Sequence, residues 1–340
     1  MKQTKNRDRG KLKDGARAAG AGQGQQTDWQ GPQDWQRDGD GPCLALGEPG
    51  AFDADHIFAP CVAYEGGKYW MWYCGSRGSV AQRVFTLGLA LSADGVRFTR
   101  HPRSPVLRFG SGTRSILTPA LLRNPEGSVC RQGGRLRLWF SSCDFPSGSA
   151  RHTLHETSSA DGLTWSAPAD IQIENIYSPT VIYDGKTYRM WYTDVGAKPW
   201  CFRYATSADG CRWSVAAQPV MVPDQAWEHK RLFYPTVVQA GGRYLMWYGS
   251  YSHAAGAEPR TSLGFAVSDD GLHWQKNPAN PVFGPDPAHT WESHYTTSQS
   301  VLRLADGSWR LWYAARPKPP FAHKYFAIGT ARWKPADRPA

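Results

Sequence analysis

Residues 183–194 read YDGKTYRMWYTD, and nearly the same phrase occurs four more times along the chain. The other copies are YEGGKYWMWYCG from Tyr64, RQGGRLRLWFSS from Arg131, QAGGRYLMWYGS from Gln239 and LADGSWRLWYAA from Leu304. In each copy a glycine-containing pair supplies a tight turn, and the following residues alternate large apolar side chains with polar or small ones. Because aromatic and β-branched residues suit a pleated surface, each phrase predicts a turn followed by a strand.

Two further phrases flank each copy. Downstream lie SADGVRF from Ser92, SADGLTW from Ser159, SADGCRW from Ser207 and SDDGLHW from Ser268, in which Asp-Gly favours a hairpin and the aromatic residue anchors the returning strand. Upstream lies a phrase centred on Pro60, Pro119, Pro179, Pro235 and, with Pro lost, Gln299. The resulting order of strands and turns describes one four-stranded antiparallel blade.

The phrases recur with separations of 59, 60, 56 and 64 residues between successive Pro positions or their equivalent. Self-similarity at this period, without a helical stretch of comparable strength, predicts an all-β fold, a five-bladed β-propeller of four-stranded antiparallel blades. The fifth copy has no Asp-Gly hairpin. Because an open edge would invite aggregation, we expect the segment Cys43–Leu46 to supply the missing strand and close the ring.

Composition divides the chain into one folded ring and two terminal segments. We expect the propeller to span residues 41–334, a disordered basic tail to span residues 1–40, and a flexible C-terminus to span residues 335–340. Residues 1–17 carry seven Lys or Arg against two Asp, which is half of the formal net charge of +10. A nucleic-acid or anionic-surface role for the tail is a minor alternative, because such runs are more often solvated.

The sequence has no apolar signal segment, no run of membrane-spanning length, and seven Cys without a repeated spacing. These features predict a cytoplasmic protein with reduced cysteines and no membrane partner. We expect no cofactor and no metal. The pair His152 and His155, three positions apart on a strand, would point to opposite faces at the surface or the rim rather than share a metal ion.

Acidic side chains gather where the propeller geometry places one rim of the central opening. The inner strand and the Trp-Tyr strand run antiparallel, so residues before each Pro phrase and after each Trp-Tyr strand meet at the same end. Asp53, Glu228 and Glu292 share a register, seven positions before the Pro or its equivalent, and each follows an aromatic residue. The candidate catalytic residues are Asp53, Asp55, Glu174, Glu228 and Glu292. The candidate substrate-binding residues are His56, Arg77, Arg114, Asp144, Asp194, His229, His294 and Arg316.

Such a set of acids has a catalytic and a structural interpretation. In a cleft, mutual repulsion raises some carboxylate pKa values while nearby arginines lower others, which suits one general acid and one general base. In the structural interpretation, acids at strand starts cap turns, and aromatic–acid pairs fix the entry of a strand. For a single residue the structural role has the stronger prior; convergence from separate blades favours a site.

At the level of these phrases, PTVIYDGKTYRMWYTD followed by ATSADGCRW resembles the five-bladed propellers of glycoside hydrolase families 32, 43, 62, 68, 117 and 130, over about residues 42–334. The resemblance implies a glycoside-active enzyme, a hydrolase or a phosphorylase, with paired carboxylates in the central funnel and a carbohydrate or glycosylated small molecule as substrate. In family 43 an Asp directly precedes the inner-strand Pro. Here the positions hold Ala59, Thr118, Ser178 and Tyr234, so that family's triad does not transfer.

By position alone, Asp53 or Asp55 would act as base or nucleophile and Glu228 or Glu292 as general acid, while Arg77, Arg114 and Arg316 would bind a carboxylate or phosphate.

Three other functions stay open. A non-catalytic glycan-binding propeller would hold sugar on rim acids and on Trp200, Trp227 and Trp291. A biosynthetic enzyme would use the funnel for non-hydrolytic work on a small molecule. A structural or protein-interaction ring would need no cluster of acids.

Overall fold

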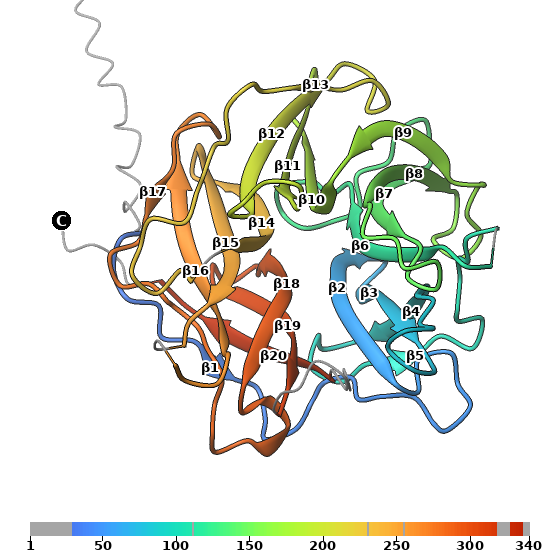
Figure 1. The fold of residues 1–340 in the computed structure, drawn as a ribbon, viewed down its shortest axis with the longest axis horizontal. Helices are drawn as coiled ribbons and strands as arrows, with labels where there is room; N and C mark the ends of the chain where they lie inside the picture. The colour runs from blue at the N-terminus through green and yellow to red at the C-terminus, as the bar shows by residue number, and fades with distance from the viewer. Residues whose placement is uncertain (1–28, 111, 230, 254–255, 318–326, 336–340) are drawn as a thin grey trace, which may run out of the picture.

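The computed structural model describes residues 29–110, 112–229, 231–253, 256–317 and 327–335. Within these ranges the chain forms a ring of antiparallel sheets around a central axis, confirming the predicted all-β propeller (Figure 1). A parallel pairing of Thr261 with Tyr295 links the fourth blade to the fifth. The one helical element in the described ranges is a short 3-10 turn, Thr290–Glu292.

The four strands of each blade follow one another from the axis outward (Figure 1). The first holds β2 (His56–Glu65), β3 (Lys68–Ser76), β4 (Thr86–Ser92) and β5 (Thr99–Arg100). The second holds β6 (Ser115–Leu121), β7 (Leu136–Cys143), β8 (Thr153–Ser159) and β9 (Ala169–Glu174). The third holds β10 (Ile176–Tyr183), β11 (Tyr188–Asp194), β12 (Cys201–Ser207) and β13 (Ser214–Val215). The fourth holds β14 (Leu232–Ala240), β15 (Arg243–Tyr251), β16 (Thr261–Ser268) and β17 (Gln275–Lys276). The fifth holds β18 (Tyr295–Arg303), β19 (Trp309–Arg316), β20 (Ala327–Trp333) and β1 (Gln36–Arg37).

The Pro phrase forms a bulge in every inner strand. The residue before the Pro, or before Gln299, has a left-handed backbone with φ between 43° and 57°, and the register with the second strand shifts there. Side chains at the bulges link neighbouring blades: the N–H of Ser178 donates to Thr118 Oγ1, and the N–H of Tyr234 donates to Ser178 Oγ. A bulge bends its strand locally, so each inner strand is bent at this position, where it faces the central channel.

The Ser-x-Asp-Gly sequences form the outer hairpin turns as predicted. In the second blade, Ser159 Oγ accepts the N–H groups of Asp161 and Gly162, and Asp161 Oδ1 accepts those of Leu163 and Thr164. These backbone donors lower the pKa of Asp161 to about 2. Gly162 has a φ of +74°, a conformation that favours glycine.

One hydrogen bond recurs at the seams between blades. The indole N–H of a buried second-strand Trp donates to the carbonyl of the hairpin glycine in the next blade. The pairs are Trp72 with Gly162 (3.0 Å), Trp139 with Gly210 (2.9 Å), Trp191 with Gly271 (2.7 Å) and Trp312 with Gly95 (2.8 Å). At three of these seams the glycine has no room for a side chain, since a Cβ would lie 2.9 Å from Trp72 at Gly162, 2.9 Å from Trp139 at Gly210 and 2.6 Å from Trp191 at Gly271.

The remaining seam uses the N-terminal segment, because the fifth blade has no Asp-Gly hairpin. Trp247 donates its indole N–H to the side-chain oxygen Oε1 of Gln33 at 2.9 Å. The strand β1 then pairs antiparallel with β20, beside which the blue segment runs in Figure 1. Leu44 adds a single bridge to Ile328.

Two sequence-based expectations are therefore corrected. The closing strand is β1 rather than Cys43–Leu46, which contributes only the Leu44 bridge. Residues 29–40, expected in the tail, belong to the ring, because Trp35 is buried against Trp247, Phe283 and Trp333. Residues 1–28 and 336–340, where the remaining tail and most of the C-terminal segment were expected, lie outside the described residues.

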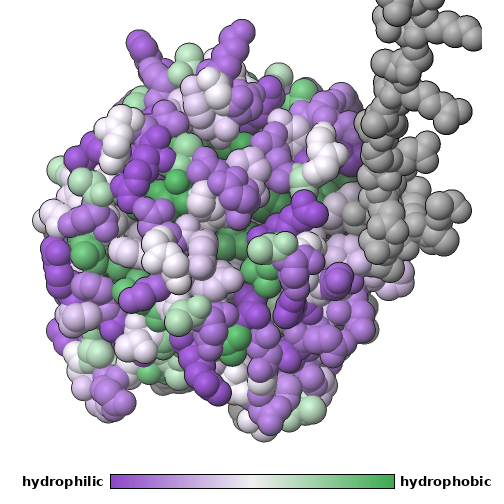
Figure 2. Space-filling view, turned by 180° about the vertical axis from the view of Figure 1, so that it is seen from behind, coloured by the Kyte–Doolittle hydropathy of each residue, from purple (hydrophilic) through white to green (hydrophobic). Residues whose placement is uncertain are grey.

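One face of the molecule is mostly hydrophilic (Figure 2). On the face opposite to that of Figure 1, polar side chains dominate the periphery and apolar ones surface between them in small groups (Figure 2). Within the described ranges, no helix has the length and apolar character needed to span a bilayer. Many of the large aromatic side chains are buried inside the blades and at the seams between them.

We predict that Gly271→Ala lowers the free energy of unfolding by about 3 kcal/mol, because it combines a left-handed backbone with a steric clash against Trp191. The matched control is Gly185→Ala. Gly185 has a φ of +91°, but no atom lies within 4 Å of the position that an added Cβ would take, so the loss should be only about 1 kcal/mol. Urea denaturation measures both. If the two variants lost the same free energy of unfolding, the close contact with the indole would not be what disfavours a side chain at position 271.

Candidate functional site

A cavity of about 480 Å³ opens at the end of the central channel where the inner strands begin and the second strands end. This is the rim at which the sequence places its candidate residues. All five blades contribute to the lining, which is mainly aromatic. The rings are Phe58, Phe85, Phe145, Tyr177, Trp200, Phe233, Tyr234, Tyr251 and Tyr295. We call this space the funnel cavity; its volume falls in the range typical of small-molecule sites.

Two guanidinium groups line the funnel cavity from non-adjacent blades. The guanidinium carbon of Arg83, in the loop between β3 and β4, lies 3.8 Å from the ring centre of Phe145. That of Arg231, just before β14, lies 4.6 Å from the ring centre of Trp200 and 5.5 Å from that of Tyr251. Each cation is therefore held on an aromatic face.

Besides the two arginines, the polar groups of the funnel cavity are the hydroxyls of four tyrosines and two threonines and one imidazole. The Tyr177 and Tyr234 hydroxyls lie 2.5 Å apart, and burial raises both pKa values, so the phenols are protonated at neutral pH. The His152 ring lies 5.0 Å from that of Tyr177. Burial, with a smaller effect from Arg83, lowers the pKa of His152 to about 4, so the ring is neutral. Its Nδ1 has no hydrogen-bond partner among the described residues.

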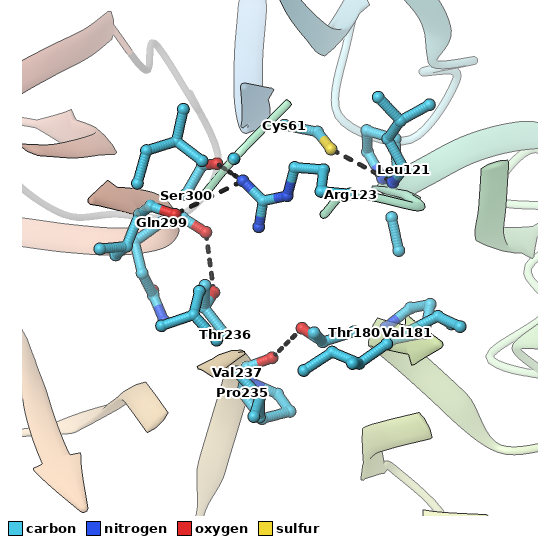
Figure 3. A pocket seen from close by; sticks show the side chains of 18 of the residues that line it. Cys61, Leu121, Arg123, Thr180, Val181, Pro235, Thr236, Val237, Gln299 and Ser300 are labelled. Atoms are coloured by element: carbon cyan, nitrogen blue, oxygen red, sulfur yellow. Dashed lines mark hydrogen bonds between the residues drawn. The ribbon is translucent and has the colours of Figure 1, made fainter. Parts of the chain in front are cut away.

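The opposite end of the channel is lined by residues of the Pro phrases and by Arg123 (Figure 3). The space there is about 80 Å³, enough for a few water molecules but not for a sugar. Arg123 projects into it, and its Nη1 donates to the carbonyl oxygens of Val62 (2.7 Å) and Val301 (3.4 Å). Since Val62 and Val301 belong to the first and last inner strands, Arg123 links the two ends of the ring at this position.

The shared register of Asp53, Glu228 and Glu292 serves the blades themselves. Each carboxylate accepts a hydrogen bond from the second-strand Tyr of its own blade and pairs with a cation on the fourth strand. The groups are Asp53 with Tyr73 (2.8 Å) and Arg100 (2.7 Å), Glu228 with Tyr248 (2.7 Å) and Lys276 (2.6 Å), and Glu292 with Tyr313 (2.7 Å) and Arg37 (2.9 Å). We call this arrangement the carboxylate clasp.

The aromatic residue before each acid completes the clasp. Phe52, Trp227 and Trp291 pack on a third-strand glycine, and a Cβ at that glycine would lie 2.5–2.7 Å from the ring. The three acids are at most 5% exposed, and none of them lines the funnel cavity. The expectation that they converge on one site is corrected: each is used within its own blade, as in the structural interpretation of the aromatic–acid pairs.

The other two acids proposed as catalytic lie at the surface. Asp55 Oδ2 accepts the N–H of Gly78 at 2.6 Å, and Asp55 and Arg77 share a separate shallow pocket. Glu174 is exposed and pairs with Arg151. None of these acids borders the funnel cavity.

None of the candidate binding residues lines the funnel cavity, and three of them lie next to residues that do. Asp144 and Asp194 directly precede the lining residues Phe145 and Val195, and Arg316 stacks on the ring of Tyr295 at 3.8 Å. Asp144 accepts the Thr113 hydroxyl at 3.2 Å, and Asp194 pairs with Arg203 at 3.1 Å.

Each of the remaining candidates has a local partner. His56 Nε2 lies 3.3 Å from the Gly78 carbonyl oxygen, and Arg114 donates to Thr153 Oγ1 at 2.6 Å. The His229 ring lies 5.0 Å from that of His253, and His294 lies 3.3 Å from Glu258. The structure thus distributes these residues around the rim rather than gathering them.

Apart from Trp200, which the sequence suggested for a glycan-binding propeller, the aromatic and basic lining was not predicted from the sequence. Its signal was the large aromatic residue one or two positions before the Pro phrase in Phe58, Tyr177, Phe233 and Tyr234, together with Arg231. His152 lies at the rim as expected, whereas His155 is buried and stacked on Phe140, which corrects its expected exposure. No group of three His, Cys, Asp or Glu that could bind a metal occurs among the described residues.

Relatives of this chain are distant. No protein-family model matches it. It is 27% identical over 242 residues to the uncharacterized protein MT1551 of Mycobacterium tuberculosis (strain CDC 1551 / Oshkosh), with 67% of this chain and 77% of that protein covered.

Several solved structures share the fold. A glycosyl hydrolase from Bacteroides ovatus has a TM-score of 0.68 at 14% identity, covering 93% of this chain and 97% of that one. A structure from the GH130 family of mannoside phosphorylases, described as containing glycoside hydrolases that target β-1,2-mannosidic linkages in Candida mannan, has a TM-score of 0.67 at 14% identity, covering 92% and 98%. An N-acetylgalactosamine deacetylase from F. plautii, in complex with blood group B trisaccharide, has a TM-score of 0.63 at 16% identity, covering 88% and 94%. The chain therefore has the propeller fold of glycoside hydrolases, and the predicted resemblance is confirmed for the fold.

We predict that Glu292→Gln lowers the free energy of unfolding by about 3 kcal/mol, because it leaves Arg37 without its buried partner. Glu174→Gln makes the same chemical change at an exposed pair and should cost no more than about 0.5 kcal/mol. Chemical denaturation of the two variants measures the difference. A Glu292→Gln protein as stable as the native chain would contradict the clasp assignment.

Proposed function

We propose that this propeller binds a carbohydrate or a glycosylated small molecule in the funnel cavity. The observation that carries the proposal is the lining itself: aromatic rings from all five blades around a space of about 480 Å³, with a few polar groups among them. The C–H face of a pyranose packs on flat aromatic faces, while its hydroxyls need donors and acceptors at the edges. The cavity offers both.

The polar groups suit sugar hydroxyls. The protonated phenols of Tyr177 and Tyr234 can donate as well as accept, and the neutral His152 ring lines the same space. Trp200 is half-buried and forms one wall beneath Arg231. Fold neighbours that are named for glycoside hydrolysis, or are bound to an oligosaccharide, support a carbohydrate ligand.

Binding, rather than cleavage by paired carboxylates, is the function that the lining favours. Glycoside hydrolysis of the common type needs one protonated and one ionised carboxyl group on either side of the scissile bond. No Asp or Glu occurs among the described residues that line the cavity. The three clasp carboxylates are themselves buried and are held by cations within their blades.

Glycoside cleavage remains the second candidate because of one observation. Asp144 and Asp194 directly precede Phe145 and Val195, so a ligand extending out of the cavity would pass near two carboxylates. A hydrolase of this kind would lose turnover in Asp144→Asn or Asp194→Asn while keeping its affinity for product. A binding protein would show no turnover in any variant.

The test is calorimetric binding to a panel of oligosaccharides and aryl glycosides, with turnover followed in the same samples with and without phosphate. We expect at least one ligand to bind, and Trp200→Ala to weaken it by about tenfold or more, equivalent to about 1.4 kcal/mol. Tyr64→Ala is the control, since Tyr64 is 44% exposed and lies away from the cavity lining. If no glycan binds, or if Trp200→Ala binds like the native chain, the proposal is wrong.

A further inference from the structure

The two arginines of the funnel cavity have N–H donors to spare. Arg83 donates from Nη1 to the carbonyl of Val80, and this is its one hydrogen bond to a described residue. The guanidinium of Arg231 forms aromatic contacts and donates no hydrogen bond to a described residue. By contrast, arginines in the blades, such as Arg137 and Arg203, pair with Glu156 and Asp194.

No carboxylate neutralises these two cations in the described part of the chain. Neither Arg83 nor Arg231 takes part in an ion pair there, and the cavity lining contains no Asp or Glu. The internal residues outside the described ranges are Ser111, Lys230, Ala254, Ala255 and 318–326, and none of them is acidic. Every acidic residue between positions 29 and 335 is therefore a described one.

Desolvation makes this arrangement costly unless an anion arrives. Arg83 and Arg231 are both only partly exposed, and burial lowers the pKa of Arg83. An aromatic face offsets part of the cost of removing a cation from water, but it leaves the in-plane N–H groups unused. A carboxylate or phosphate accepts two such N–H groups on two charged oxygens, an arrangement that a single neutral hydroxyl does not offer.

We infer that the ligand of the funnel cavity carries an acidic group, a carboxylate or a phosphate, that Arg231 receives while its sugar ring stacks on Trp200 or the neighbouring rings. Arg83 supplies a second cation on the far side of the cavity for another anionic oxygen. This inference rests on the proposed carbohydrate-binding function and narrows it to acidic sugars. The residues differ from Arg77, Arg114 and Arg316, for which the sequence suggested such a role.

The inference is tested by calorimetry on the full chain with four probes: glucose, glucuronate, glucose 6-phosphate and inorganic phosphate. We expect at least one acidic sugar to bind about tenfold or more tightly than glucose at low salt, and this preference to shrink as salt is raised. Arg231→Gln should abolish the preference, so that the acidic sugar binds no more tightly than glucose does to the same variant. Arg83→Gln should reduce it by a smaller factor.

Arg212→Gln is the matched control. Its guanidinium is 93% exposed on an outer hairpin, so the variant makes the same change in net charge away from the cavity and should keep the preference. Equal affinities for glucose and both acidic sugars would overturn the acidic-ligand inference and leave the carbohydrate proposal standing. Persistence of the preference in both Arg231→Gln and Arg83→Gln would overturn it as well. If inorganic phosphate binds and no sugar does, the carbohydrate proposal itself fails.

Discussion

The indole hydrogen bond between blades is the interaction on which the rest of the ring depends. A Trp on each second strand is fully buried at a seam, and in four of the five blades it places its one polar atom against the hairpin of the next blade. A buried N–H without an acceptor would be unfavourable, so each blade requires its neighbour to present a carbonyl at one position. The hairpin glycine meets both needs, because its backbone is left-handed and it has no Cβ to exclude the ring.

The same requirement explains how the ring closes. The fifth blade ends without a hairpin, and Trp247 would lack an acceptor there; the side-chain oxygen of Gln33 takes the place of the glycine carbonyl. Once Gln33 is in position, Trp35 is buried and Arg37 reaches Glu292, as Arg100 reaches Asp53 in the first blade. Closure therefore repeats the contacts of an ordinary blade with residues from the other end of the chain.

The carboxylate clasps have a consequence for the site. In three blades an acid that enters near the rim is turned outward, toward a tyrosine and a cation of its own sheet. The axis is left to aromatic rings and to arginines that the blades do not neutralise. Selectivity at such a surface arises from stacking and from charge, whereas a funnel of free carboxylates would favour acid–base chemistry. The same fold can support either, because the blades set the frame and the rim residues set the chemistry.

The sequence by itself determined the fold, since repeats of turn, Trp-Tyr strand and Asp-Gly hairpin specify local geometry that each blade forms from its own residues. It also located the rim, because strand order alone decides which ends meet. Only the tertiary structure decided what the rim residues do. Asp53, Glu228 and Glu292 share a register that fits a common site and a repeated clasp equally well, and the distinction depends on Arg100, Lys276 and Arg37, which are 47 to 255 positions away. The same holds for Gln33 and Trp35: nothing local separates them from a polar tail, and their burial arises from contacts more than 200 positions along the chain.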